Sequence, residues 1–286
     1  MRNRSVLNSP RLREVKKKRR TVFFRKAGIV FLFFAIILVA LAFASRWGKL
    51  NISEVKVSGV TSEDAEMIEK IIQERIDGKY FFLFPKSNVL LFSRTNISEE
   101  LARDYKRFKN INVTVPKTST LEVSLAERKA EFLWCGNEFI FSSEIGQCYF
   151  MDETGYIFDE APYFSGDVYF KFYGKADDDD DPRGVYFIQQ NFSEIDFFRE
   201  LLSDIGVRPA SLYAKDESEM EFYLHSTSGA MPPKIIFKPT DDFVKLSENL
   251  QSAMSTDPLK SDFKKKYDSL EYIDLRFGNR VYYRFR

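Results

Sequence analysis

An uninterrupted acidic run, Asp177–Asp181, is the first candidate for metal chemistry. Clustered carboxylates can hold a divalent cation, and an Asp-x-Asp motif holds the metal of glycosyltransferases. Five like charges in a row also repel one another, and Pro182 and Gly184 follow them. We therefore interpret the run as a solvated loop that binds no metal.

Nucleophilic and zinc chemistry have few candidate residues. His225 is the only histidine, and the hydroxyl residues Ser226, Thr227 and Ser228 lie beside it without forming a recognisable triad. One histidine and two cysteines argue against a zinc site built by the protein, and no glycine-rich phosphate loop is present. The sequence predicts a protein that is not an enzyme, with no cofactor and no small-molecule substrate.

The two cysteines, Cys135 and Cys148, lie thirteen residues apart across a predicted hairpin. They can form a disulfide if their compartment is oxidising. Two buried free thiols are the alternative.

Four Asn-x-Ser/Thr triplets keep a second functional class open. They begin at Asn51, Asn96, Asn112 and Asn191. In a eukaryotic secretory protein such asparagines can be glycosylated. The alternative is then a type II, lumen-facing glycosyltransferase with Asp177–Asp181 as metal ligands.

The last six residues alternate between two faces of a predicted strand. One face carries Val281, Tyr283 and Phe285, and the other carries Tyr282, Arg284 and Arg286. If this strand lies at a sheet edge, its free N–H and C=O groups are a template for a partner strand. Arg284 and Arg286 would then meet acidic partner residues, while Tyr282 or Tyr283 supplies an apolar anchor. The alternative is an edge protected from pairing by its own charges.

The strand Tyr272–Phe277 precedes this segment across a Gly278-Asn279 turn. Asp274 and Arg276 lie two residues apart and therefore share a face, and Phe277 ends the strand. A structural ion pair and a contact with a partner both remain open for Asp274 and Arg276.

The element that must position all these groups is the uncharged stretch Ala27–Ser45. As a helix it spans about 28 Å, close to the thickness of the bilayer hydrocarbon. Residues 1–26 hold eleven Lys or Arg and one acid, Glu14. The positive-inside rule then predicts a cytoplasmic tail over 1–26, a transmembrane helix over 27–46 and residues 46–286 outside. Cleavage of a signal peptide after Ala42-Phe43-Ala44 is the alternative.

Charge is distributed asymmetrically along the chain. The formal net charge of the chain is +1. Residues 1–26, the basic leader, contribute 11 − 1 = +10, so residues 27–286 carry a net charge of +1 − 10 = −9. A mildly acidic exported part argues against nucleic acid as a partner. We expect residues 1–21 to be disordered and the basic leader to lie against anionic lipid.

Residues 50–126 are expected to form a small unit with the order strand, helix, helix, strand, strand. Thr61 and Asp64 resemble a capping box, and apolar residues recur at helical spacing after them. The apolar stretch Tyr80–Phe92 is too short to cross a bilayer. We expect it to pack on the unit's core, with contact to a membrane surface or a partner as the alternative.

Residues 127–286 are expected to form a larger, mostly antiparallel β domain with two or more helices. Short aromatic strands alternate with turns up to about Phe172, followed by helices from Ser193 and Asp241. The fold class is therefore α+β behind one apolar helix.

In this order the elements resemble the bacterial division proteins of the FtsQ/DivIB family. Leu121–Arg128 resembles the strand leading into the Glu-Arg pair at the start of the family's β domain, although Lys129-Ala130 replaces the usual proline. Phe132–Trp134 resembles the next strand. Tyr149–Phe158 resembles the Asp-x-x-Gly hairpin, and Tyr272–Tyr283 resembles the closing Asp-Leu-Arg hairpin. The coverage is about residues 20–286, and the persuasive features are the order and spacing of these motifs.

The resemblance implies that the small unit is a POTRA domain and that the chain is a scaffold without catalytic residues. It implies a single-pass protein of the inner membrane at the division septum. The implied partners are the single-span proteins FtsB/DivIC and FtsL, with FtsB held at the end of the β domain. A POTRA-bearing envelope-assembly factor is a further alternative.

Overall fold

The computed structural model describes residues 10–117, 119–140, 146–164, 168–176, 181–226 and 231–286. Within these residues the chain forms two compact units. The first comprises the chain up to Glu100 together with Asn110–Leu125, and the second comprises Leu101–Lys109 together with Ala126–Arg286. The fold is mixed α+β with one long apolar helix at its N-terminal end, as the sequence predicts.

Helix α1 (Pro10–Ser45) is continuous through the basic leader and the apolar stretch. The expectation of disorder is therefore wrong for residues 10–21, and residues 1–9 lie outside the described residues. The leader is rich in Lys and Arg, which have good helix propensity. Because the apolar segment already forms a helix, extending it avoids the cost of a new nucleus, and Pro10 suits the first helical position.

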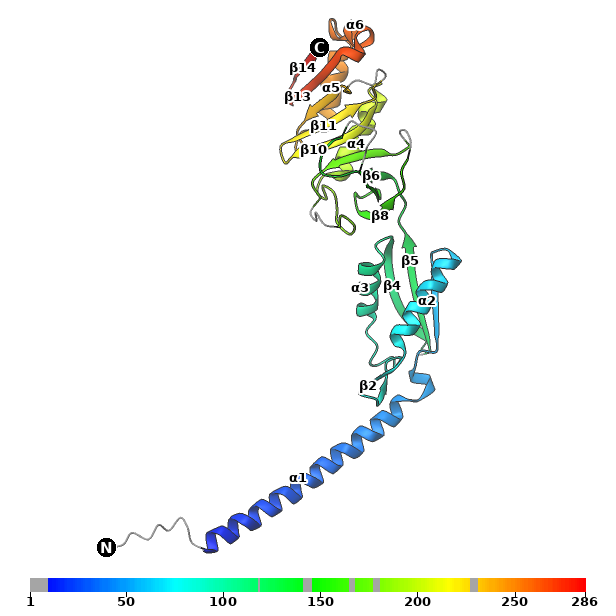
Figure 1. Ribbon diagram of the computed structural model, residues 1–286, viewed down its shortest axis with the longest axis vertical. Coiled ribbons are helices and arrows are strands. Elements are labelled where there is room, and N and C mark those ends of the chain that lie inside the picture. Colours follow the sequence, from blue (N-terminus) through cyan, green and yellow to red (C-terminus); the bar gives the residue numbers. More distant parts are fainter. Residues whose placement is uncertain (1–9, 118, 141–145, 165–167, 177–180, 227–230) are drawn as a thin grey trace, which may run out of the picture. The chain divides into compact units, whose positions relative to one another are not determined.

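The rest of the first unit, as far as the structure describes it, combines a three-stranded sheet with two helices. Its elements are η2 (Gly48–Leu50), β1 (Glu54–Ser58), α2 (Ser62–Ile76), β2 (Lys79–Tyr80), β3 (Phe84–Pro85), α3 (Arg94–Asp104), β4 (Phe108–Lys117) and β5 (Thr120–Glu127). The sheet order is β1-β5-β4, with β1 parallel to β5. The predicted order strand, helix, helix, strand, strand is present as β1, α2, α3, β4 and β5, and the short β2-β3 hairpin lies between α2 and α3 in the sequence (Figure 1).

Helix α2 forms as its sequence predicts. The Thr61 hydroxyl caps it by accepting from the Asp64 backbone N–H at 3.3 Å. Ile68, Ile72 and Ile76 are buried, which confirms the helical spacing.

The stretch Tyr80–Phe92 differs from the expectation of core packing. Phe81 and Phe82 are 87% and 90% exposed, and Leu90 is 79% exposed. Both Phe81 and Phe82 adopt positive φ, at 49° and 62°, in the loop that joins β2 to β3. Asn88, which the apolar pattern did not single out, is the buried residue of this stretch.

Over the residues that the structure describes, the second unit is built on a nine-stranded sheet. Its strands are β6 (Phe132–Trp134), β7 (Cys148–Met151), β8 (Ile157–Ala161), β9 (Phe170–Gly174), β10 (Pro209–Asp216), β11 (Glu219–Leu224), β12 (Lys234–Phe237), β13 (Leu270–Phe277) and β14 (Arg280–Phe285). Among the described residues the order is β14-β13-β12-β11-β10-β9-β6-β7-β8. Antiparallel pairs outnumber parallel ones, the parallel pairs being β12/β13, β9/β10 and β6/β9.

One face of this sheet is covered by α4 (Phe192–Asp204) and α5 (Phe243–Met254), with α6 (Leu259–Lys265) and η3 (Tyr267–Ser269) after them. The main core lies between the sheet and these helices. Aromatic rings dominate it: Phe198 lies 4.9 Å from Phe243 and 5.1 Å from Phe237, centroid to centroid. A smaller cluster around Leu133 and Tyr173 forms a second group of buried side chains.

One strand predicted in this unit does not form over the described residues. Phe139, expected to begin a strand ending at Phe141, lies outside the strands and stacks on Tyr223 at 3.7 Å between ring centroids. The contact with the Tyr223 ring of β11 fixes the Phe139 side chain, although its backbone does not pair with a neighbouring strand in the described residues. On α5, Phe243, Leu246 and Leu250 are buried, whereas Val244 is 48% exposed.

Candidate partner-binding edge

Strand β14 lies at one end of the nine-stranded sheet (Figure 1). In the described part of the chain it pairs only with β13, antiparallel, with Tyr272 opposite Arg284 and Ile273 opposite Tyr283. The predicted hairpin and its edge position are therefore present. An edge strand presents backbone groups that can bind a further strand.

The two faces of β14 are those that the alternation predicts. Val281, Tyr283 and Phe285 pack against the main core, whereas Tyr282 and Arg284 are exposed. The inward face fixes the strand to the unit. The outward face and the free edge remain accessible in the described structure.

One hydrogen bond just beyond the end of β14 shows to which side of the strand each backbone N–H group points. The Arg286 N–H donates to the Ser269 carbonyl at 2.7 Å, toward the β13 side. Because backbone N–H groups alternate between the two sides of a strand, those of Tyr282 and Arg284 also face β13. The N–H groups of Val281, Tyr283 and Phe285 therefore point to the open edge.

The side chains around this edge supply apolar and cationic groups. Tyr282 is 45% exposed and Phe277 is 55% exposed, and their rings meet edge to face at 5.2 Å. Arg284 forms an exposed ion pair with Glu271 at 3.0 Å, and Arg286 donates to the Met231 carbonyl at 2.8 Å. An exposed ion pair of this kind contributes little to stability, so a partner can replace it at small cost.

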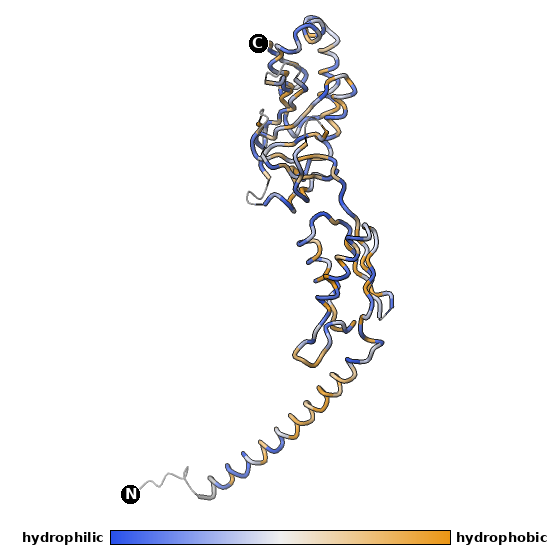
Figure 2. Tube along the Cα trace, turned by 45° about the vertical axis from the view of Figure 1, so that its right-hand side comes forward, coloured by the Kyte–Doolittle hydropathy of each residue, from blue (hydrophilic) through white to orange (hydrophobic). Residues whose placement is uncertain are grey.

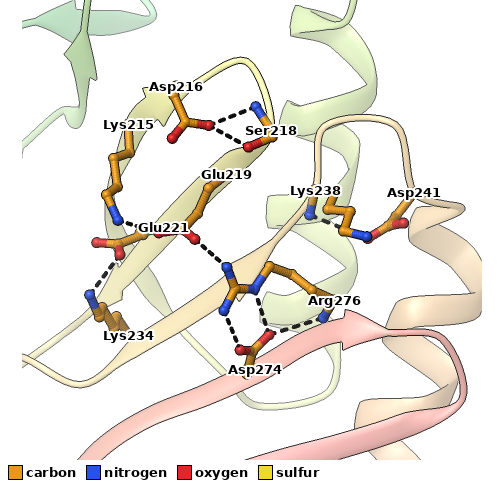
Figure 3. A network of polar contacts seen from close by, with 10 residues as sticks. All are labelled: Lys215, Asp216, Ser218, Glu219, Glu221, Lys234, Lys238, Asp241, Asp274 and Arg276. Carbon is orange, nitrogen blue, oxygen red and sulfur yellow. Dashed lines mark hydrogen bonds and ion pairs between the residues drawn. The ribbon is translucent and has the colours of Figure 1, made fainter.

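Asp274 and Arg276 have a different environment. Asp274 is 5% exposed, and its carboxylate accepts from the Arg276 side chain at 2.6 and 2.9 Å (Figure 3). Arg276 also bonds to Glu219 of β11. The hydrogen bonds that Arg276 donates to Asp274 raise the pKa of Arg276, so the guanidinium stays charged. This geometry favours the structural ion pair over a direct partner contact.

The network continues across neighbouring strands (Figure 3). Lys215 of β10 pairs with Glu219 at 2.6 Å, and Lys234 of β12 pairs with Glu221 at 2.6 Å. Glu221 is 3% exposed and also accepts from the Tyr223 hydroxyl at 2.6 Å. Burial, together with this hydrogen bond, raises the pKa of Tyr223. These contacts hold the strands next to the edge in fixed register.

Arg128 of the Glu-Arg pair contacts Asp152 of the Asp-x-x-Gly hairpin. The sequence analysis did not predict this contact. The Arg128 guanidinium binds the Asp152 carboxylate and lies 3.9 Å from the Tyr156 ring centroid. Asp152 is fully buried and also accepts from the Thr154 N–H at 2.9 Å and hydroxyl at 2.6 Å. Burial works to raise the pKa of Asp152, but the hydrogen bonds from Thr154 and Arg128 outweigh it and leave this pKa below its usual value. The only sequence signal was that both residues belong to recognisable motifs.

Cys135 and Cys148 form a disulfide. The bond joins the end of β6 to the start of β7, continuing the register in which Trp134 lies opposite Tyr149. The disulfide alternative of the sequence is therefore the one present.

The residues considered for other chemistry are placed as follows. Asp181 forms a two-point ion pair with Arg183 at 2.9 and 3.1 Å, while Asp177–Asp180 lie outside the described residues. His225 is exposed and its carbonyl accepts from the Tyr267 hydroxyl at 2.9 Å; Thr227 and Ser228 are not among the described residues. No group of three or more potential metal ligands occurs in the described ranges.

Two of the four candidate glycosylation sites have engaged amides. The Asn51 amide donates to the Ser45 and Trp47 carbonyls at 3.0 and 2.8 Å, and that of Asn191 donates to Pro239 at 3.1 Å. Asn96 and Asn112 are exposed.

Helix α1 contains one segment, Glu14–Ser45, that is long and apolar enough to cross a membrane, the only such helix in the part of the chain that the structure describes. Almost none of its most apolar part is buried within the protein. Figure 2 shows the change from hydrophilic to hydrophobic residues along this helix.

No protein-family model matches this chain, and a search of curated proteins finds no significant match.

Proposed function

We propose that this chain is a non-enzymatic, single-pass membrane scaffold of the bacterial divisome, of the FtsQ/DivIB kind. Helix α1 anchors it in the inner membrane, with residues 1–26 in the cytoplasm and residues 46–286 outside at the septum. Its role is to link early division components to septal peptidoglycan synthesis.

The proposed topology is supported by length, charge and cysteine chemistry. The apolar segment of α1 has the length of a membrane span, and the basic residues precede it. The Cys135–Cys148 disulfide suits an oxidising extracytoplasmic compartment.

The single observation that carries the proposal is the free edge of β14 at the end of the nine-stranded sheet. A strand from an FtsB/DivIC-like protein would add to this edge and bond to the backbone of Val281, Tyr283 and Phe285. Tyr282 and Phe277 supply an apolar anchor beside it, and Arg284 and Arg286 meet acidic partner residues. An FtsL-like protein accompanies this partner as part of the same assembly.

The first unit is proposed to be the POTRA-like domain of the scaffold. Its β1-β5-β4 sheet with α2 and α3 agrees in element order with the expectation from the resemblance. In this proposal it recruits other division proteins while β14 holds the FtsB-like partner. The glycosyltransferase and envelope-assembly alternatives share the topology, and no contact among the described residues favours either over the scaffold.

The experiment that tests this function combines imaging with purification from membranes. A fluorescent protein fused to the N-terminus of the full chain should accumulate at mid-cell, and FtsB- and FtsL-like proteins should co-purify with it. A uniform distribution in the envelope with neither partner would contradict the scaffold proposal.

A further inference from the structure

The segment Lys79–Phe92, here called the aromatic loop, exposes large apolar side chains without a partner in the first unit. Phe81 and Phe82 are 87% and 90% exposed, and Leu90 is 79% exposed. These three side chains lie within ten residues of one another, and their exposure to water is unfavourable. These side chains would be stabilised by an apolar surface that is not part of the described chain.

The aromatic loop is fastened to the C-terminal end of α1 by the side chain of Asn88. The Asn88 amide donates to the Ser45 carbonyl at 2.9 Å and to the Ser45 hydroxyl at 3.3 Å. Its Oδ1 accepts from the Leu90 N–H at 3.0 Å. Asn88 is 2% exposed, so both halves of its amide are used in a buried site.

Backbone hydrogen bonds reinforce this attachment. The Val89 N–H donates to the Leu50 carbonyl and the Ile52 N–H donates to the Ser87 carbonyl, each at 2.9 Å. Strand β3 also contacts α1, and Ala42, about one turn before the end of the helix, is buried. Figure 1 shows the β2-β3 hairpin beside this end of α1, and both belong to the first unit.

The attachment fixes the depth of the aromatic loop relative to a membrane that α1 crosses. Ser45 is the last residue of the uncharged stretch, so it lies where the hydrocarbon meets the outer interface. A loop bonded to Ser45 lies at the same level. Trp47 is 68% exposed at this level, and aromatic residues are enriched at membrane interfaces.

The backbone of the loop directs its two phenylalanines away from the unit. Phe81 and Phe82 have φ of 49° and 62°, a left-handed conformation that bulky residues rarely adopt. Strained backbone of this kind clusters at functional sites, which makes this turn a candidate for one. Lys79 and Lys86 flank the pair and provide cations for lipid headgroups.

We propose that the aromatic loop is a second membrane contact, which inserts Phe81 and Phe82 into the outer interface of the bilayer beside α1. The occupant of this apolar surface is lipid rather than a partner protein. The proposal rests on the membrane-anchor part of the proposed function and goes beyond its partner-binding role.

The test uses the full chain reconstituted in vesicles of phosphatidylethanolamine and phosphatidylglycerol, with the native disulfide intact. Leu90→Cys carries an environment-sensitive fluorophore and leaves both phenylalanines in place. Met67→Cys on α2, an exposed position of the same unit, carries the same fluorophore as the matched control. Lipids with a nitroxide near the headgroup should quench the Leu90 label several-fold more than the Met67 label.

Replacing Phe81 and Phe82 tests whether these side chains hold the aromatic loop in the membrane. In the Leu90→Cys chain, Phe81→Ser combined with Phe82→Ser should reduce the quenching to near the level of the Met67 label. Burial of each phenylalanine favours insertion by on the order of tenfold, so losing both should leave the loop mostly in water.

A third label separates this proposal from the membrane anchor. Leu38→Cys lies within α1 and should be quenched by lipids with a nitroxide near the end of the acyl chain. If Leu38 is quenched and Leu90 behaves like Met67, the membrane contact of the loop is wrong and a partner protein is the remaining occupant. If Leu38 is not quenched either, the proposed anchor itself fails.

Discussion

At the residue scale, the buried Asp152–Arg128 pair fixes the start of the second unit. Asp152 is fully buried, and the Arg128 side chain is 13% exposed. Removing one member of a buried pair leaves the other charge without compensation. This contact therefore stabilises the fold rather than a partner.

Asp152→Asn should lower the free energy of unfolding by about 3 kcal/mol, because Arg128 loses its counter-charge in a buried site. Thermal unfolding of the purified full chain measures this. Glu153→Gln is the matched control, since its ion pair with Lys109 is largely exposed and should contribute under about 1 kcal/mol. Equal effects of the two substitutions would contradict the structural role of Asp152.

The same pair predicts a dependence on pH. The pKa of Asp152 is lowered in the folded state, so its stabilisation is present above the pKa of the unfolded chain and is lost as pH falls through the folded value. The stability difference between wild type and Asp152→Asn should be full at neutral pH and shrink below about pH 4. A constant difference down to strongly acidic pH would be inconsistent with this.

Two arginines of the β13–β14 hairpin should separate stability from binding. Arg276 bonds to the buried Asp274 and to Glu219, so Arg276→Ala should lower the unfolding temperature clearly. Arg284 is exposed, so Arg284→Glu should leave that temperature nearly unchanged and weaken binding of an FtsB-like partner roughly tenfold. Thermal unfolding and pull-down are measured on both variants; unaltered binding by Arg284→Glu would remove this arginine from the interface.

At the element scale, the sequence predicts most helices and strands but not the full length of α1. The spacing of Ile68, Ile72 and Ile76 fixes α2, and the alternation of Val281, Tyr283 and Phe285 fixes the faces of β14. The extension of α1 through residues 10–21 was not predicted, because charge composition favours disorder while continuity with an existing helix favours helix.

Long-range contacts explain the remaining differences. The apolar pattern of Tyr80–Phe92 indicates burial, but it cannot show that Asn88 is the buried residue and that Phe81 and Phe82 are exposed. That outcome depends on hydrogen bonds to Ser45, more than forty residues away in sequence. Helix α6 was missed as well; it is a seven-residue element with little periodicity to detect.

The disulfide gives a prediction for the β6–β7 hairpin. Cys135→Ser combined with Cys148→Ser should lower the free energy of unfolding by about 3 kcal/mol, because closing a loop of this length restricts the unfolded chain. Chemical denaturation checks this value. Reductant should destabilise the wild type to a similar extent and leave the double variant unchanged; no effect of reductant on the wild type would show that the bond is absent.

At the scale of the whole molecule, the proposal requires one orientation across the membrane. Met67→Cys lies in the first unit and should react with a membrane-impermeant maleimide added to intact spheroplasts. Ser5→Cys in the basic tail should react only after the membrane is opened. Labelling of Ser5→Cys in intact spheroplasts would reverse the orientation, and loss of the tail from the mature protein would support the cleaved signal peptide.

The central claim is that β14 binds a partner strand through its open edge. The backbone N–H of Tyr283 points to that edge, whereas the N–H of Tyr282 faces β13. Proline removes an N–H, so Tyr283→Pro should block pairing from outside while leaving the β13 ladder intact. Tyr283→Ala removes the same side chain but keeps the N–H, which makes it the matched control.

The most direct measurement is the affinity of purified full-length protein for an FtsB-like partner, compared between Tyr283→Pro and Tyr283→Ala with thermal unfolding in parallel. We predict that the two variants unfold at similar temperatures and that Tyr283→Pro binds at least about tenfold more weakly than Tyr283→Ala. Equal affinity of two folded variants would contradict strand addition at β14.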